Sequence, residues 1–168
     1  MIDTHCHLGL CTRPVETILE LAKQEGVSHM VNVATDIASA KAAQQLAQRY
    51  PQQLSATVGL YPGKKAGERE LQQVREQAKT GRYCAIGEIG LDYFRVTTSP
   101  EEQKAALMAQ LEIAKECALP VIIHNRQADA DIIRCVEAYP MVKKVFHCFA
   151  STWEVAEQLL HPNHYMSF

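Results

Sequence analysis

Short apolar runs rich in β-branched residues recur along the whole chain, and stretches with helical spacing of apolar positions lie between them. These runs predict seven strands, at residues 1–7, 30–34, 55–60, 83–89, 120–124, 144–149 and 165–168. Strands and helices alternate without any low-complexity linker, which predicts βαβ units, a parallel sheet and right-handed crossovers. We expect residues 1–168 to form a single domain.

Two of the predicted helices have clear start and stop signals. The first, residues 14–23, begins with a proline and ends before a glycine. The second begins after Ser99, a suitable N-cap that is followed by proline and two acids, and runs to about Ala118, before Pro120.

Polar residues fall at or near the carboxyl ends of four separate predicted strands: His7, Glu88, His124 and His147. Barrel enzymes gather their active sites at this end of the strands. A doubly wound sheet is the alternative, but it would favour a glycine-rich turn after the first strand, and none follows His7. The pattern therefore predicts an α/β fold of the TIM-like (β/α) barrel type.

The length changes this expectation in one respect. Such a barrel has eight strands and about 250 residues, whereas this chain of 168 residues supplies about seven strands. We expect an incomplete barrel, truncated at the C-terminus, whose unpaired strand edges could support self-association.

Composition and charge narrow the class of protein. With 47% hydrophobic and 21% charged residues, the chain has the composition of a globular protein. It contains neither a secretion signal nor a long apolar segment, so we expect a cytoplasmic location and no membrane partner. The formal net charge of -2 argues against a protein that binds nucleic acid through a broad basic surface. Six cysteines without CxxC spacing are interpreted as reduced, buried thiols.

The strongest candidate chemistry is a metal site. His5 and His7 are two apart in a predicted strand, so both imidazoles face the same side and can hold one ion. Nitrogen and carboxylate ligands suit Zn²⁺, and Mn²⁺ or Mg²⁺ when more oxygen ligands are present. Taken alone, the pair could equally be two histidines in a mobile N-terminal strand.

Glu88 strengthens the metal interpretation because it lies in an otherwise apolar strand, where a buried carboxylate needs a partner. His124 and His147 each end an apolar run, and each alone is typical of a hydrogen-bonded core histidine. Together, these residues at the ends of several strands favour a metal centre.

Two other groups of charged residues have less specific interpretations. Arg126 could meet an anionic group of a substrate, or could pair with Asp129 or Asp131 at the surface. The Lys143–Lys144 pair is interpreted as solvated charge.

Four short motifs resemble the signatures of TatD family metal-dependent hydrolases, particularly the YjjV-like branch. They are residues 4–7 (THCH), 87–92 (GEIGLD), 124–128 (HNRQA) and 146–149 (FHCF), and the resemblance covers residues 1–168. It implies a barrel of the amidohydrolase type with a two-metal phosphodiesterase site, which family members use as a deoxyribonuclease, often from 3′ to 5′. DNA is therefore the expected substrate.

The resemblance also implies roles for individual residues. His5 and His7 would bind one divalent ion (Zn, Mg or Mn), His124 and His147 the other, and Glu88 would bridge the two. Tyr61, where the family usually has histidine, and Arg126 are the candidate substrate-binding residues.

The last family signature, a Thr-Asp pair that supplies a metal ligand and the general base, would lie beyond Phe168. We therefore assign no catalytic base within the chain and expect weak activity or none, because losing a positioned base lowers the rate by about 10² to 10⁴. The alternatives are a non-catalytic metal-binding or self-associating protein, and a hydrolase of amides or esters such as aminoacyl esters.

Overall fold

The computed structural model describes residues 1–64, 66–95 and 97–168. Among these residues, seven strands form one sheet in which neighbours are parallel and the strand order follows the chain. The strands are β1 (Ile2–Cys6), β2 (His29–Asn32), β3 (Leu54–Val58), β4 (Ala85–Asp92), β5 (Val121–Arg126), β6 (Lys144–Phe146) and β7 (His164–Met166). All seven predicted strands are confirmed, and their ends differ from the predicted ones by at most three residues.

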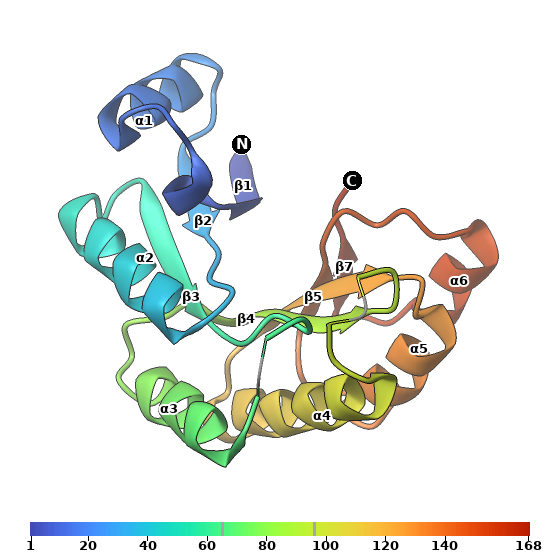
Figure 1. Cartoon of the computed structure of the whole chain (residues 1–168). Coiled ribbons are helices and arrows are strands. Elements are labelled where there is room, and N and C mark those ends of the chain that lie inside the picture. Colours follow the sequence, from blue (N-terminus) through green and yellow to red (C-terminus); the bar gives the residue numbers. More distant parts are fainter. Residues whose placement is uncertain (65, 96) are drawn as a thin grey trace.

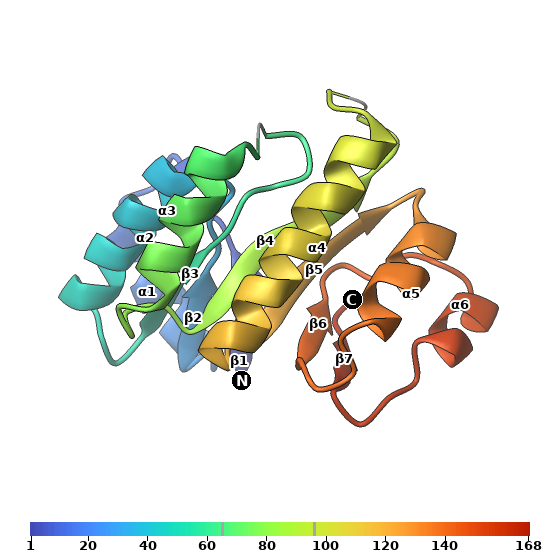
Figure 2. The same ribbon diagram turned by 90° about the horizontal axis from the view of Figure 1, so that it is seen from below.

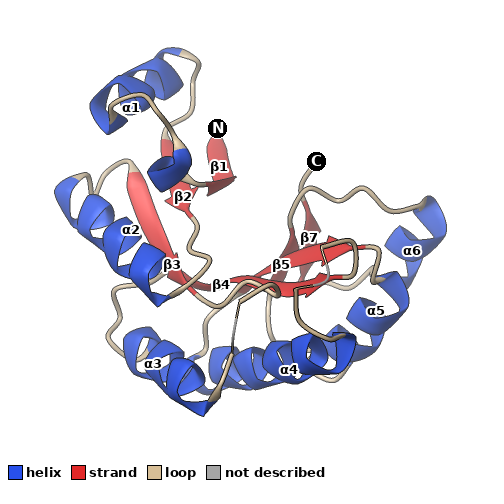
Figure 3. Ribbon diagram, in the orientation of Figure 1, coloured by secondary structure: helices blue, strands red, loops and turns tan. Residues whose placement is uncertain are grey.

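The sheet curls, and the helices lie along its convex outer face (Figures 1 and 3). They are α1 (Val15–Gln24), α2 (Ile37–Arg49), α3 (Glu68–Ala78), α4 (Pro100–Cys117), α5 (Asp129–Glu137) and α6 (Trp153–Gln158), with a 3-10 turn η1 (Leu8–Leu10) after β1. Figure 2 shows α3, α4 and α5 lying across the outside of the sheet. The expected TIM-like barrel is confirmed as a curled half-barrel. Among the described strands, β1 and β7 each pair along one edge only.

Helix α4 forms as its sequence signals predict. The Ser99 hydroxyl accepts the Glu102 amide hydrogen, and the Glu102 carboxylate accepts the Ser99 amide hydrogen. This reciprocal capping satisfies two amide groups that an isolated helix end would leave unpaired. Leu107 and Leu111 are fully buried in the core that α4 shares with β4.

Strand β4 lies at the centre of the sheet, and all eight of its residues are buried. Gly90 has a φ of +145°, and a Cβ atom at this position would stand 1.9 Å from the carbonyl oxygen of His124. A Cβ atom on Gly59 would likewise stand 2.9 Å from the backbone of Gly87. Because glycine alone fits such contacts, these positions allow β3, β4 and β5 to approach closely. The approach brings Glu88 beside His124.

The structure corrects two expectations about side chains outside the candidate site. Lys144 is not solvated: it is completely buried, and its ammonium group donates to the carbonyl oxygens of Tyr139 and Val142 at 2.7 and 2.8 Å. Burial lowers the pKa of Lys144 to about 8. All six cysteines are free, as expected, but three of them are exposed rather than buried: Cys11, Cys84 and Cys148.

None of the helices in the described ranges combines the length and the apolar composition that crossing a membrane requires.

Candidate metal centre

Three side-chain donor atoms, from His5, His7 and Glu88, lie close together. The Nε2 atoms of His5 and His7 lie 3.0 Å apart, and each lies 3.6 Å from Oε2 of Glu88. The histidines come from β1 and the turn that follows it, whereas the glutamate comes from β4, which does not pair with β1. Two ligands that each lie about 2.0–2.1 Å from one ion are separated by roughly 3–3.5 Å. The spacing of the three atoms therefore fits a shared divalent cation.

The hydrogen bonding of His7 agrees with this fit. Its Nδ1 lies 2.9 Å from the carbonyl oxygen of Val33, which can only accept, so Nδ1 carries the hydrogen. When the ring is neutral, Nε2 keeps its lone pair and can bind a cation, whereas without a cation the contact with Glu88 raises the pKa of His7. Ligand histidines commonly have such a partner at the nitrogen that does not bind the metal.

Glu88 divides its two carboxylate oxygens between different histidines. Oε2 faces His5 and His7, and Oε1 lies 2.9 Å from Nδ1 of His124. Burial opposes ionisation of Glu88, but the hydrogen bond with His124 and the nearby rings of His5 and His7 outweigh it and hold the pKa of Glu88 well below its usual range. The group is therefore a buried carboxylate with two separately directed oxygens.

Asp92 also belongs to this cluster, although no role for it was predicted from the sequence. It is completely buried at the end of β4. Its Oδ2 accepts the Tyr61 hydroxyl at 2.6 Å and lies 3.2 Å from Nε2 of His124. Burial opposes ionisation of this carboxyl too, but the bonds from Tyr61 and from the Arg95 amide hold the pKa of Asp92 below its usual value. His124 thus lies between two carboxylates, Glu88 at one nitrogen and Asp92 at the other.

A sequence signal for Asp92 exists: it is a second acid at the end of the same apolar strand, four positions after Glu88. A carboxylate buried there needs a partner for the same reason that Glu88 does, and this signal could have identified Asp92 as a site residue.

His147 lies against His5. The two rings stack with centroids 3.3 Å apart and planes 11° apart. Burial lowers the pKa of His147 to about 4, so the ring is neutral near pH 7. Among the described residues, no hydrogen bond joins the His147 ring to Glu88 or His124, so its pairing with His124 around one ion stays a prediction.

The two candidate substrate-binding residues lie near the cluster in different ways. The Tyr61 hydroxyl donates to Asp92 and lies 3.3 Å from His124, so it is part of the buried network. The guanidinium carbon of Arg126 lies 4.0 Å from the ring centroid of Phe94. Within the described part of the chain, the two acids proposed as its ion-pair partners bind other groups: Asp129 accepts from Asn125 and Ser151, and Asp131 from Tyr93, Lys104 and Arg134.

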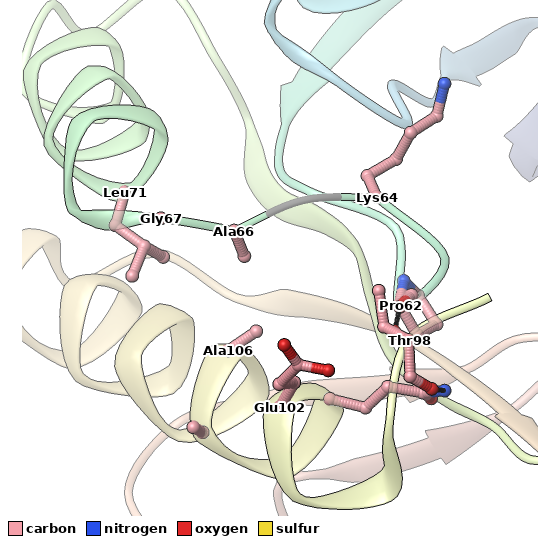
Figure 4. Close-up of a pocket in the computed structure, with 10 residues that line it drawn as sticks. Pro62, Lys64, Ala66, Gly67, Leu71, Thr98, Glu102 and Ala106 are labelled. Carbon is pink, nitrogen blue, oxygen red and sulfur yellow. Dashed lines mark hydrogen bonds between the residues drawn. The ribbon is translucent and has the colours of Figure 1, made fainter. Parts of the chain in front are cut away.

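Two cavities help to locate the site. One, of about 340 Å³, opens beside His7 between η1 and α2. Another, of about 310 Å³, lies between the loop before α3 and the first half of α4, and none of the histidines or acids of the cluster lines it (Figure 4). Because the first cavity borders the cluster through His7, the cluster is a better candidate for chemistry than the second cavity.

The chain matches known proteins along its whole length. A model of the TatD related DNase family matches residues 2–168. The metal-dependent hydrolase YabD of Bacillus subtilis is 33% identical over 100% of this chain and 68% of its own length. A 3′-5′ ssDNA/RNA exonuclease TatD of Pectobacterium carotovorum is 33% identical over 86% of this chain and 57% of its own length.

A solved structure agrees with both relatives. The crystal structure of YjjV, a TatD homologue from Escherichia coli, superposes with a TM-score of 0.88 at 30% identity, and the match covers 98% of this chain and 66% of that one. The chain thus spans between roughly a half and two thirds of the length of these proteins. Together with the geometry of the cluster, these matches show that the chain belongs to the TatD family of metal-dependent hydrolases.

Proposed function

We propose that this chain carries a centre for two divalent cations (Zn, Mg or Mn) that hydrolyses phosphodiester bonds in DNA or another single-stranded nucleic acid. One observation carries the proposal: Glu88 directs one oxygen to His5 and His7 and the other to His124. In this proposal His5 and His7 hold one cation, His124 and His147 hold the other, and Glu88 bridges them.

When bound, two cations would clamp a phosphodiester, lower the pKa of a water molecule and stabilise the leaving oxygen. The chain itself orients the metal ligands. It also supplies the guanidinium group of Arg126, which can contact a phosphate. The names of relatives as ssDNA/RNA exonucleases favour this substrate class. The net charge of -2 is compatible with it, because two divalent ions would create a local positive site.

The test uses a 5′-labelled single-stranded oligonucleotide with Mg²⁺, Mn²⁺ or Zn²⁺. In this proposal all five ligand side chains bind cations, so none of them is free to act as general base. We therefore expect the oligonucleotide to be shortened slowly from its 3′ end, and the reaction to stop in EDTA. Removing a positioned base typically lowers a rate by about 10² to 10⁴. An aminoacyl-ester panel runs in parallel. Ester cleavage without oligonucleotide cleavage would favour the alternative substrate class, and bound metal without either reaction would favour a non-catalytic centre.

Asp92 is proposed to position His124, because it accepts at the nitrogen opposite the one that faces Glu88. Replacing Asp92 with asparagine should weaken binding of one cation by about 10- to 100-fold, the usual effect of losing such a partner. Calorimetric titration of the metal-free protein with Mn²⁺ measures this change.

The matched control is Asp131→Asn, since Asp131 also accepts a tyrosine hydroxyl, from Tyr93, but does not contact His124. Equal affinities in the parent chain and in the Asp92→Asn variant would remove Asp92 from this role.

Three further parts of the proposal concern the whole chain. We propose one domain over residues 1–168, a cytoplasmic location, and self-association through the edges of β1 and β7 that pair with no other described strand.

A further inference from the structure

An exposed aromatic ring lies under a guanidinium group at the carboxyl end of the sheet. Phe94 is 56% exposed, which is high for a large apolar side chain, and the Arg126 guanidinium carbon lies 4.0 Å from its ring centroid. Arg126 is itself exposed, and within the described ranges no carboxylate forms an ion pair with it. The pair therefore presents both a flat apolar face and an unneutralised positive charge to solvent.

The backbone on both sides of this pair is held in place. Oδ1 of Asp92 accepts the amide hydrogens of Phe94 and Arg95 at 3.0 and 2.8 Å, which closes a tight turn after β4. The Tyr93 amide donates to the carbonyl oxygen of Arg126 at 2.9 Å. Because these bonds fix the two segments relative to each other, the ring and the guanidinium group are arranged before any ligand arrives.

The same carboxylate connects the pair to the metal centre. While Oδ1 of Asp92 holds the turn that carries Phe94, Oδ2 lies 3.2 Å from His124. Arg126 follows His124 by two positions in β5, so both side chains leave the strand on the same side. A ligand on the pair would therefore reach the rim of the proposed cation centre.

We propose that Phe94 and Arg126 form a stacking platform for one base and one phosphate of a single-stranded nucleic acid bound at the metal centre. The proposal rests on the proposed function and adds the residues that would hold one nucleotide of its substrate. Aromatic faces bind any unpaired base by stacking, whereas the bases of a duplex are already stacked and inaccessible. A guanidinium group pairs with phosphate through charge-assisted hydrogen bonds.

The first test measures the affinity of the 168-residue chain for a fluorescein-labelled oligothymidylate by anisotropy in EDTA, so that cleavage and bound cations do not contribute. Phe94→Ala should weaken binding about 5- to 100-fold, the range for loss of one stacked base. Phe94→Trp should bind at least as tightly as the parent chain, and the oligonucleotide should quench the fluorescence of the new indole. Met141→Ala is the control, because Met141 is 83% exposed in the loop before β6, at the opposite end of the sheet.

The second test measures how binding depends on salt. Arg126→Gln should reduce the slope of log K against log salt by about 0.7, the value for one phosphate contact in a single strand. Arg82→Gln, which removes an exposed arginine before β4, should leave the slope unchanged.

The two proposals fail in different ways. Three results would each overturn the platform, whatever the outcome of the cleavage assay. They are an affinity of the Phe94→Ala variant within twofold of the parent, no detectable binding by the parent chain, and an equal loss of affinity for a blunt duplex. A normal Phe94 effect with no cation-dependent cleavage of any oligonucleotide would overturn the proposed hydrolysis and leave the platform standing.

Discussion

A chain in which Glu88 is replaced by glutamine should bind divalent cations much more weakly than the parent chain. The carboxylate faces His5 and His7 with one oxygen and His124 with the other, so one substitution removes the shared charge from both halves of the proposed centre. Glutamine has nearly the same shape but offers a single neutral oxygen. Because Glu88 is proposed as a direct ligand, the affinity should fall by more than the roughly 10- to 100-fold typical of an outer partner.

Elemental analysis after dialysis against buffered Zn²⁺ or Mn²⁺ measures the occupancy, and titration calorimetry measures the affinity. Glu112→Gln is the matched control, because Glu112 is a partly exposed acid on α4 that forms an ion pair with Lys115. If Glu88→Gln and Glu112→Gln proteins retained the same metal content as the parent chain, Glu88 would not be a ligand.

Replacing Gly90 with alanine should have the largest effect on folding. The new Cβ atom would stand 1.9 Å from the carbonyl oxygen of His124, and the φ of +145° is strained for any residue with a side chain. Overpacking of a core typically lowers the free energy of unfolding by about 1–3 kcal/mol, and a strained backbone adds about 1–3 kcal/mol. We therefore expect a total loss of about 2–6 kcal/mol.

Urea unfolding followed by circular dichroism measures this loss. Gly9→Ala is the control, because Gly9 lies in η1, close to His7, and a Cβ atom added there would meet no described atom within 4 Å beyond its own chain neighbours and the backbone of η1. A Gly90→Ala protein that unfolds at the same urea concentration as the Gly9→Ala protein would show that β4 and β5 can separate without loss of stability.

The strand and helix pattern could be predicted because it depends on local signals. β4 is apolar apart from Glu88 and Asp92 because it is buried on both faces, and α4 carries its own capping residues at Ser99 and Glu102. The prediction for Lys144 was wrong for a physical reason. A lysine beside another lysine normally indicates a side chain exposed to solvent. The burial of Lys144 depends on two carbonyl oxygens in the preceding loop, which no sequence pattern reveals.

The candidate site was only partly predictable from the sequence. Spacing alone suggested that His5 and His7 face the same side, but the approach of Glu88 to both depends on the curvature of the whole sheet. Arg126 had two equally good interpretations, and no sequence pattern reveals its contact with Phe94, thirty-two residues earlier in the chain. The stacking of His147 on His5 likewise joins opposite ends of the sequence.

The position of the centre has a mechanical consequence for the sheet. His5 and Glu88 lie on strands that do not pair with each other, so no ladder of backbone hydrogen bonds fixes the distance between them. A cation held by both would act as a cross-link between the first and fourth strands and would resist flattening of the sheet. Ion binding and sheet curvature would then be a single linked equilibrium: each bound ion favours the tightly curved form, and whatever opens the curve releases the ion.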